Sequence, residues 1–208
     1  QSEDPVHIVG PAPLTLGKWK LSAPAMAEHR NCAILRSSLF HSKLPSVKIV
    51  SPSKGLLSTR QFLAEKTNAL GGAQITAEDI LFFNGLGDAI STFYQYFSPA
   101  SRVIGPSPAY STHSSAEAAN AQSEPITYRL NPANHWYPDM EDMRNKIHYN
   151  KNIVGILLIN PDNPTGMVYP LEILKEIVSL AKEYNLFILC DEIYTNIVYN
   201  GARSYKLA

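Results

Sequence analysis

The sequence has few cysteines and no excess charge of either sign. Its only cysteines, Cys32 and Cys190, lie far apart and without a CxxC or His-rich spacing, so we expect neither a disulfide framework nor a zinc site. The 18 Lys and Arg residues balance 18 Asp and Glu residues, which argues against capture of nucleic acid or an anionic membrane surface. These counts favour a cytoplasmic protein that binds small molecules.

Long apolar runs are also missing. The longest, such as Ile153–Ile159, are strand-sized and far shorter than the roughly 20 residues of a membrane-spanning helix. The first residues, Gln1–Asp4, contain neither an initiator Met nor a basic-then-apolar leader, so we expect no intact signal peptide. With 208 residues, 45% of them hydrophobic, the chain can build one sizeable core. We expect one α/β domain or part of one.

Periodicity divides the chain in two. Residues 1–53 show no sustained period, which predicts an irregular arm with short helices. A helix is expected to open at Ser58, where Gln61 completes a capping-box spacing, and to end at Gly71-Gly72. Strands and amphipathic helices then alternate, with one helical face over Ile90–Phe97 and a helix from Pro170 to about Asn185. The expected strands are Ile80–Phe83, Arg102–Gly105, Ile126–Leu130, Ile153–Ile159 and Leu186–Leu189.

Three polar clusters directly follow expected strands: Asn84–Gly87, Asn160–Gly166 and Asp191–Tyr194. In sheets of parallel strands, ligands bind beyond the carboxyl ends of the strands. We therefore expect these three clusters to meet at one site.

The first two clusters each allow a binding role and a purely structural one. Asn84–Gly87 fits an anion, because a helix N-terminus presents unpaired N–H groups and glycines allow close approach. A tight turn capped by Asp88 explains it equally well. In Asn160–Gly166, two Asn-Pro steps hold a rigid turn that can aim an Asn amide at a ligand oxygen. An ordinary Pro-rich connection is the alternative.

The third cluster places a carboxylate at a strand end. Asp191 stands where a buried acceptor would meet a heterocycle, and it needs a cationic or donor partner because buried carboxylates are costly. A solvated Asp at the start of a loop is the alternative. Tyr194 brings a phenol to the same site, or serves only in packing.

Together, the order and spacing of these clusters resemble the class I and II aminotransferases, which are fold-type I enzymes dependent on pyridoxal phosphate (PLP). The resemblance runs from about residue 51 to residue 200. It implies a three-layer α/β/α large domain of the PLP-dependent transferase type, truncated here, with a mostly parallel sheet. Residues 54–208 would form part of this PLP-binding domain, and residues 1–53 an arm or part of the small domain.

The resemblance also implies contacts to two parts of the cofactor. The backbone of three consecutive residues would bind the phosphate: Gly85, Leu86 and Gly87. Tyr110 would stack on the pyridine ring, where an aromatic ring both positions and shields the cofactor.

Four further residues would bind or support the polar edge of the ring. Asn163 and Tyr194 would donate to the phenolic oxygen. Asp191 would pair with the pyridine nitrogen and favour its protonation, typically by about one to three pKa units. His113 would support Asp191 from behind, although a surface helix residue is almost as good an explanation of it.

The family's Schiff-base lysine follows the Asp-x-x-Tyr segment by some tens of residues. No lysine here fits that place, and Lys206 is too close to Asp191, so we assign no catalytic residue and expect the 208-residue chain alone to be inactive.

The resemblance implies an aminotransferase, homodimeric as the intact protein, which moves an amino group between an amino acid and a 2-oxo acid. A PLP-dependent lyase or synthase and a catalytically inactive binding module remain open. A dinucleotide-binding domain is disfavoured because Ile90 replaces the third glycine of that pattern.

Overall fold

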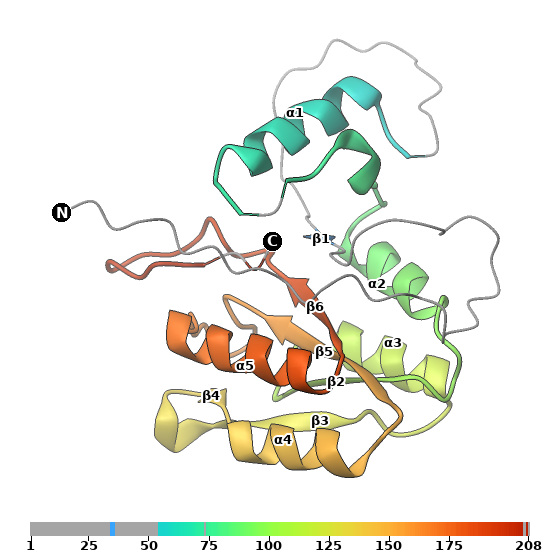
Figure 1. Ribbon diagram of the computed structural model, residues 1–208, viewed down its shortest axis with the longest axis vertical. Coiled ribbons are helices and arrows are strands. Elements are labelled where there is room, and N and C mark those ends of the chain that lie inside the picture. The colour runs from blue at the N-terminus through green and yellow to red at the C-terminus, as the bar shows by residue number, and fades with distance from the viewer. Residues whose placement is uncertain (1–33, 36–53, 73, 206, 208) are drawn as a thin grey trace.

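One six-stranded sheet organises the protein (Figure 1). The computed structural model describes residues 34–35, 54–72, 74–205 and 207. The sheet has the order β1-β6-β5-β2-β3-β4, and only the β3–β4 pair is antiparallel. Its strands are β1 (Ile34–Leu35), β2 (Arg102–Ser107), β3 (Thr127–Asn131), β4 (Tyr137–Pro138), β5 (Ile153–Ile159) and β6 (Phe187–Asp191). Because β2, β5 and β6 run parallel, their carboxyl ends share one edge of the sheet.

Helices cover both faces of this sheet. They are α2 (Leu86–Tyr94), α3 (Ser111–Ala121), α4 (Met140–Tyr149) and α5 (Leu171–Glu183). Helix α1 (Leu57–Asn68) packs instead on the short 3₁₀ helix η2 (Ala77–Asp79), and a second 3₁₀ helix, η3 (Pro132–Asn134), follows β3. Residues of α4 and α5 pack with Ile156 and Leu158 of β5, whereas residues of α2 and α3 pack with Leu157 and Ile159. Figure 1 shows the two helix pairs on opposite sides of the strands. The predicted three-layer α/β/α arrangement is confirmed.

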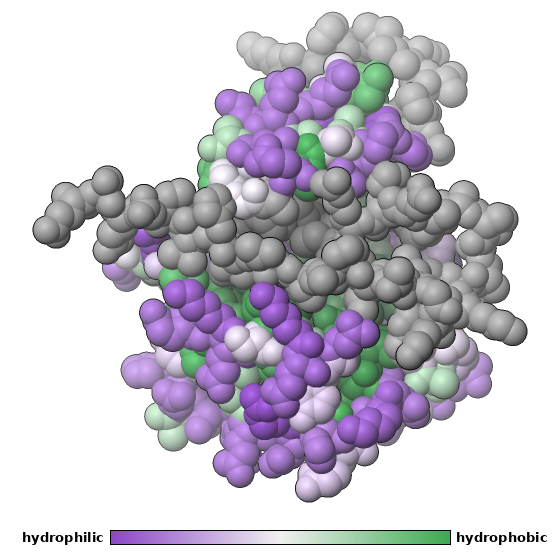
Figure 2. All heavy atoms as spheres, viewed as in Figure 1, coloured by the Kyte–Doolittle hydropathy of each residue, from purple (hydrophilic) through white to green (hydrophobic). Residues whose placement is uncertain are grey.

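Strand β5 lies at the centre of the sheet because its sequence, Ile153–Ile159, contains only apolar residues and glycine. All seven of its residues are buried, as expected of a parallel strand covered on both faces. Gly155 lies under the ring of Phe187, where an added Cβ would come within 2.3 Å of ring carbons. The expected apolar stripe of α5 is buried as well, including Leu174, Ile177 and Ala181. The solvent-facing surface over α4 and α5 is mainly hydrophilic (Figure 2).

Two local predictions are wrong. Ile80–Phe83 forms no strand in the structure, and Leu81 and Phe83 are exposed. The capping box at Ser58 does not form either: α1 begins at Leu57, after Leu56, and has no side-chain cap. Helix α1 is instead tied to η2 by buried Arg60, whose guanidinium donates to the Ala77 carbonyl.

The N-terminal arm proposed over residues 1–53 lies outside the described residues, apart from Ile34–Leu35, which form β1 against β6. Cys32 and Lys206 also lie outside them. In the described part of the chain, no helix has the length and apolarity to span a bilayer.

Candidate functional site

The order in which the chain adds strands to the sheet reverses between β2 and β5. Helix α3 connects β2 to β3 on one face, and α5 connects β5 to β6 on the other, so the chain leaves this point in opposite directions. Such a switch point is where ligands bind in open α/β sheets, beyond the carboxyl ends of the strands. The ends of β2, β5 and β6 therefore form the candidate binding site.

The second and third polar clusters meet there, as predicted. Ile159 at the end of β5 pairs with Asp191 at the end of β6. The Asn160 N–H donates to the Asp191 carbonyl over 3.0 Å. The Asn160–Gly166 loop and the Asp191 carboxylate thus leave the sheet side by side.

His113 completes this part of the site. Its Nε2 lies 3.0 Å from Oδ2 of Asp191, and the two side chains are 0% and 2% exposed. The other oxygen of Asp191, Oδ1, accepts the Ile193 N–H over 3.2 Å. Asp191 is therefore a buried carboxylate with donor partners, and His113 is not a surface residue. Each carboxylate oxygen can accept a second hydrogen bond, so Asp191 retains capacity for a ligand.

The Gly85–Gly87 turn opens α2 as expected. Gly85 is the N-cap at φ 95°, a conformation that favours glycine, and a Cβ at Gly85 or Gly87 would meet nothing within 4 Å. The exposed Asp88 side chain turns back toward the turn itself, because its Oδ2 accepts the Asn84 N–H over 3.0 Å. No strand precedes this turn. It is instead placed by packing of α2 against α3, the helix that carries His113. An exposed helix N-terminus with open glycines suits a phosphate.

Three further side chains around the strand ends remain available. Tyr110 is the N-cap of α3, just beyond β2, and is 39% exposed. Asn163 and Tyr194 are both half-buried. Within the described residues, none of the three side chains is hydrogen-bonded to another residue.

Three buried polar residues escaped the sequence-based assignment: Asn160, Asp162 and Glu192. The Asn160 Oδ1 accepts the Tyr169 N–H over 2.9 Å, and Glu192 Oε1 accepts the Leu207 N–H over 3.2 Å. Burial raises the pKa of Asp162, although hydrogen bonds from Thr165 and the nearby Tyr169 hydroxyl oppose the shift. Their only sequence signal is position inside the clusters already identified.

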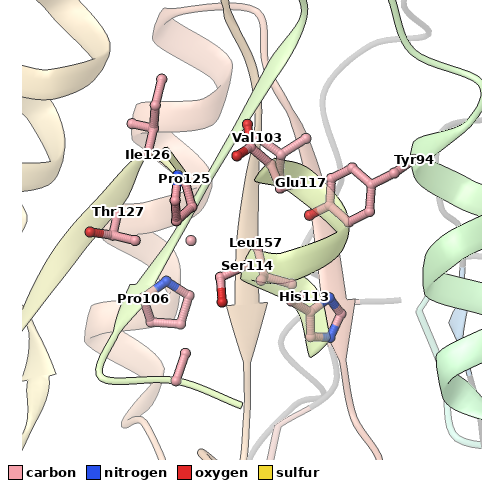
Figure 3. Close-up of a pocket in the computed structure, with 12 residues that line it drawn as sticks. Tyr94, Val103, Pro106, His113, Ser114, Glu117, Pro125, Ile126, Thr127 and Leu157 are labelled. Carbon is pink, nitrogen blue, oxygen red and sulfur yellow. The ribbon is translucent and has the colours of Figure 1, made fainter. Parts of the chain in front are cut away.

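A small hollow beside α3 adjoins this site, because His113 is one of the residues that line it (Figure 3). Its volume is about 10 Å³, and apolar residues such as Val103, Ile126 and Leu157 line much of it. That volume is at the lower limit for one water molecule. No group of three or more metal-ligating side chains occurs among the residues described.

Comparisons with known proteins point in one direction. A family model described as aminotransferase class I and II matches residues 18–207. An uncharacterized aminotransferase of Methanocaldococcus jannaschii is 64% identical over 156 residues, which are 75% of this chain and 36% of that protein. The glutamate-pyruvate aminotransferase AlaA of Escherichia coli is 35% identical over 166 residues, covering 79% of this chain and 40% of AlaA.

Solved structures give the same result. An aminotransferase from Escherichia coli superposes with a TM-score of 0.73 at 34% identity, over 79% of this chain and 40% of that one. The alanine aminotransferase from Pyrococcus furiosus superposes with a TM-score of 0.67 at 29% identity, over 74% and 38%. The chain thus spans well under half the length of these relatives.

Proposed function

The chain belongs to the class I and II aminotransferase family, and from that premise we propose that it holds PLP where β2, β5 and β6 end. The fold class expected from the sequence, the large-domain fold of fold-type I PLP enzymes, is confirmed by the structural matches. Residues 54–208 are proposed as part of the PLP-binding domain, and residues 1–53 as an arm or part of the small domain. The activity proposed for the whole protein is amino transfer between an amino acid and a 2-oxo acid.

The observation that carries the proposal is the buried His113–Asp191 pair at the end of β6. We propose that the Asp191 carboxylate holds a proton on the pyridine nitrogen, since an adjacent anion favours the charged ring. His113 acts through Asp191, because its hydrogen bond fixes the direction of the carboxylate. A buried carboxylate needs such donors to remain ionised at low cost.

The remaining groups bind the rest of the cofactor. Asn163 and Tyr194 are proposed to donate to the phenolic oxygen, and Tyr110 to cover one face of the ring. The N–H groups at the start of α2, from Gly85, Leu86 and Gly87, are proposed to bind the phosphate. Bound PLP would supply an electron-accepting ring for the bond changes at the substrate. We propose no residue of this chain as the Schiff-base lysine.

We propose further properties of the whole protein from its family and its composition. The family implies amino acid and 2-oxo acid substrates, and a homodimer as the intact protein. The balanced charge and the scarcity of cysteine favour a cytoplasmic protein that binds neither nucleic acid nor membrane.

The test is a transamination assay on the full-length protein with PLP. Relatives are named for glutamate, pyruvate and alanine, so alanine with 2-oxoglutarate is the first pair to try. We expect equimolar pyruvate and glutamate, and loss of both in the Asp191→Ala variant. Release of ammonia, or breakdown of the amino acid without transfer, would instead indicate a lyase. Absence of any PLP binding would contradict the proposal.

A further inference from the structure

The buried carboxyl of Asp162 has no part in the roles proposed above. The residue is 3% exposed. Its Oδ2 accepts hydrogen bonds from the Thr165 N–H over 3.2 Å and from the Thr165 hydroxyl over 2.5 Å. Its Oδ1 is buried without a well-formed hydrogen bond to the described residues, and the Tyr169 hydroxyl lies close enough to the carboxyl to lower its pKa. Burying an ionisable group costs free energy. The burial of the Asp162 carboxyl therefore indicates a specific role that a surface aspartate would not have.

The backbone closes a loop at the same point. The Asp162 N–H donates to the Met167 carbonyl over 2.8 Å, and the Gly166 N–H donates to the Asp162 carbonyl over 2.9 Å. Gly166 has φ 73°, which lets the chain turn back. With the two side-chain bonds, Asp162 is tied to all three residues from 165 to 167. Asn163 and Pro164 are left at the tip.

The base of this loop is tied to the strand ends. Asn160 donates its N–H to the Asp191 carbonyl, and its side chain accepts the Tyr169 N–H. The base is therefore fixed relative to Asp191. The direction of Asn163 at the tip depends on the second tie, which Asp162 makes.

We propose that Asp162 is a positioning residue: its carboxyl holds the turn from 162 to 167 so that the Asn163 amide faces the cofactor. This inference rests on the proposed function, because it concerns the same site. The turn requires an acceptor at position 162, since both bonds to Thr165 are accepted there. It does not require a charge, so Asn can replace Asp162, whereas Ala cannot.

A double-mutant cycle on the full-length protein tests this role. The PLP dissociation constant is measured by fluorescence titration for wild type, Asp162→Ala, Asn163→Ala and the double variant, with Asp162→Asn as the matched control. We expect Asp162→Ala to weaken binding about tenfold, the order of one lost hydrogen bond, and Asp162→Asn to change it less than about twofold. In the Asn163→Ala background, Asp162→Ala should add almost nothing, because its effect passes through Asn163.

A purely structural role gives a different pattern. Equal weakening by Asp162→Ala in both backgrounds, or no weakening at all, overturns the inference. Should Asp162→Ala fail to fold, Thr165→Val takes its place in the cycle, because it removes the hydroxyl that donates to the same oxygen and also accepts the Met167 N–H within the same turn. A smaller loss that disappears in the Asn163→Ala background supports the inference, and an additive loss overturns it.

The two proposals fail in distinguishable ways. If wild-type protein does not bind PLP, both are wrong. If wild type binds PLP and the cycle is additive, only the role of Asp162 is wrong.

Discussion

His113 and Asp191 are 78 positions apart in the chain, yet Nε2 of the first lies 3.0 Å from Oδ2 of the second. The histidine comes from α3, and the aspartate ends β6. Both side chains are buried, so the bond joins a helix layer to the central sheet. The direction of the Asp191 carboxylate is thereby set by the fold itself, before a ligand binds.

Replacing His113 tests whether that direction matters. His113→Ala should weaken PLP binding by the full-length protein about ten- to a hundredfold, because hydrogen bonds to charged groups contribute about 1.5–3 kcal/mol. Fluorescence titration measures the change. Ser114→Ala is the matched control on the same helix, since the Ser114 hydroxyl donates only to the Ser111 carbonyl. Equal affinities for wild type and His113→Ala would show that Asp191 needs no such support.

Gly87→Ala separates phosphate binding from helix stability. The added Cβ meets no atom within 4 Å, and Ala is up to about 1 kcal/mol better than Gly within a helix. We expect an unchanged or higher melting temperature together with PLP affinity lowered several-fold, because a methyl group hinders close approach of the phosphate. Calorimetry and PLP titration on one preparation give both values. Unchanged PLP affinity would show that the phosphate does not bind at this turn.

Glu117→Gln should lower the stability of the protein. Arg102 donates to both carboxylate oxygens of Glu117, whose side chain is 4% exposed, and this pairing raises the pKa of Arg102. The change leaves a largely buried guanidinium without its counter-charge and weakens its hydrogen bonds, at a cost of about 1.5–3 kcal/mol. Urea denaturation measures the loss. Glu183→Gln, in the exposed pair with Arg144, should change stability little. Similar effects of the two variants would count against the burial argument.

Asp162→Asn should make stability depend less on pH. Burial raises the pKa of Asp162, so the folded protein keeps this proton in a pH range where the unfolded chain has lost it. Wild-type stability therefore falls as pH rises from the unfolded pKa, near 3.9, through the folded pKa. Asn does not titrate, so the stability of the variant relative to wild type should increase with pH over that window. A constant difference in urea denaturation from pH 4 to 7 would contradict this.

The sequence predicts helices and strands best where the composition of a segment is compatible with only one position in the fold. The run Ile153–Ile159 matches β5 at both ends, because seven consecutive buried residues fit only between two layers. The short run Ile80–Phe83 looks similar but has no neighbouring strand, and two of its side chains face solvent. Helix α4 is absent from the predicted elements although its signals are local: Asp139 caps it, and Met143 and Ile147 are buried one turn apart. Strand β1 falls inside the arm that was expected to be irregular.

Some residues of the candidate site can be predicted from the sequence and others cannot. Asp191 and the Asn160–Gly166 loop are predictable, because each follows a recognisable buried strand. The burial of His113 is not, since it depends on a partner 78 residues away, and only family resemblance indicates it. Asp162 and Glu192 were missed because an acid beside a proline or another acid normally faces water. Their burial arises from loop packing that no local pattern encodes.

The account depends most on the contact between Asp191 and the pyridine nitrogen. Nitrogen-15 NMR of full-length protein loaded with ring-labelled PLP measures the protonation of that atom directly. We predict a pyridinium signal in wild type that persists above the pH where free PLP loses this proton, and an unprotonated signal at the same pH in Asp191→Ala. An unprotonated nitrogen in wild type, or the same signal in both proteins, would contradict the assignment.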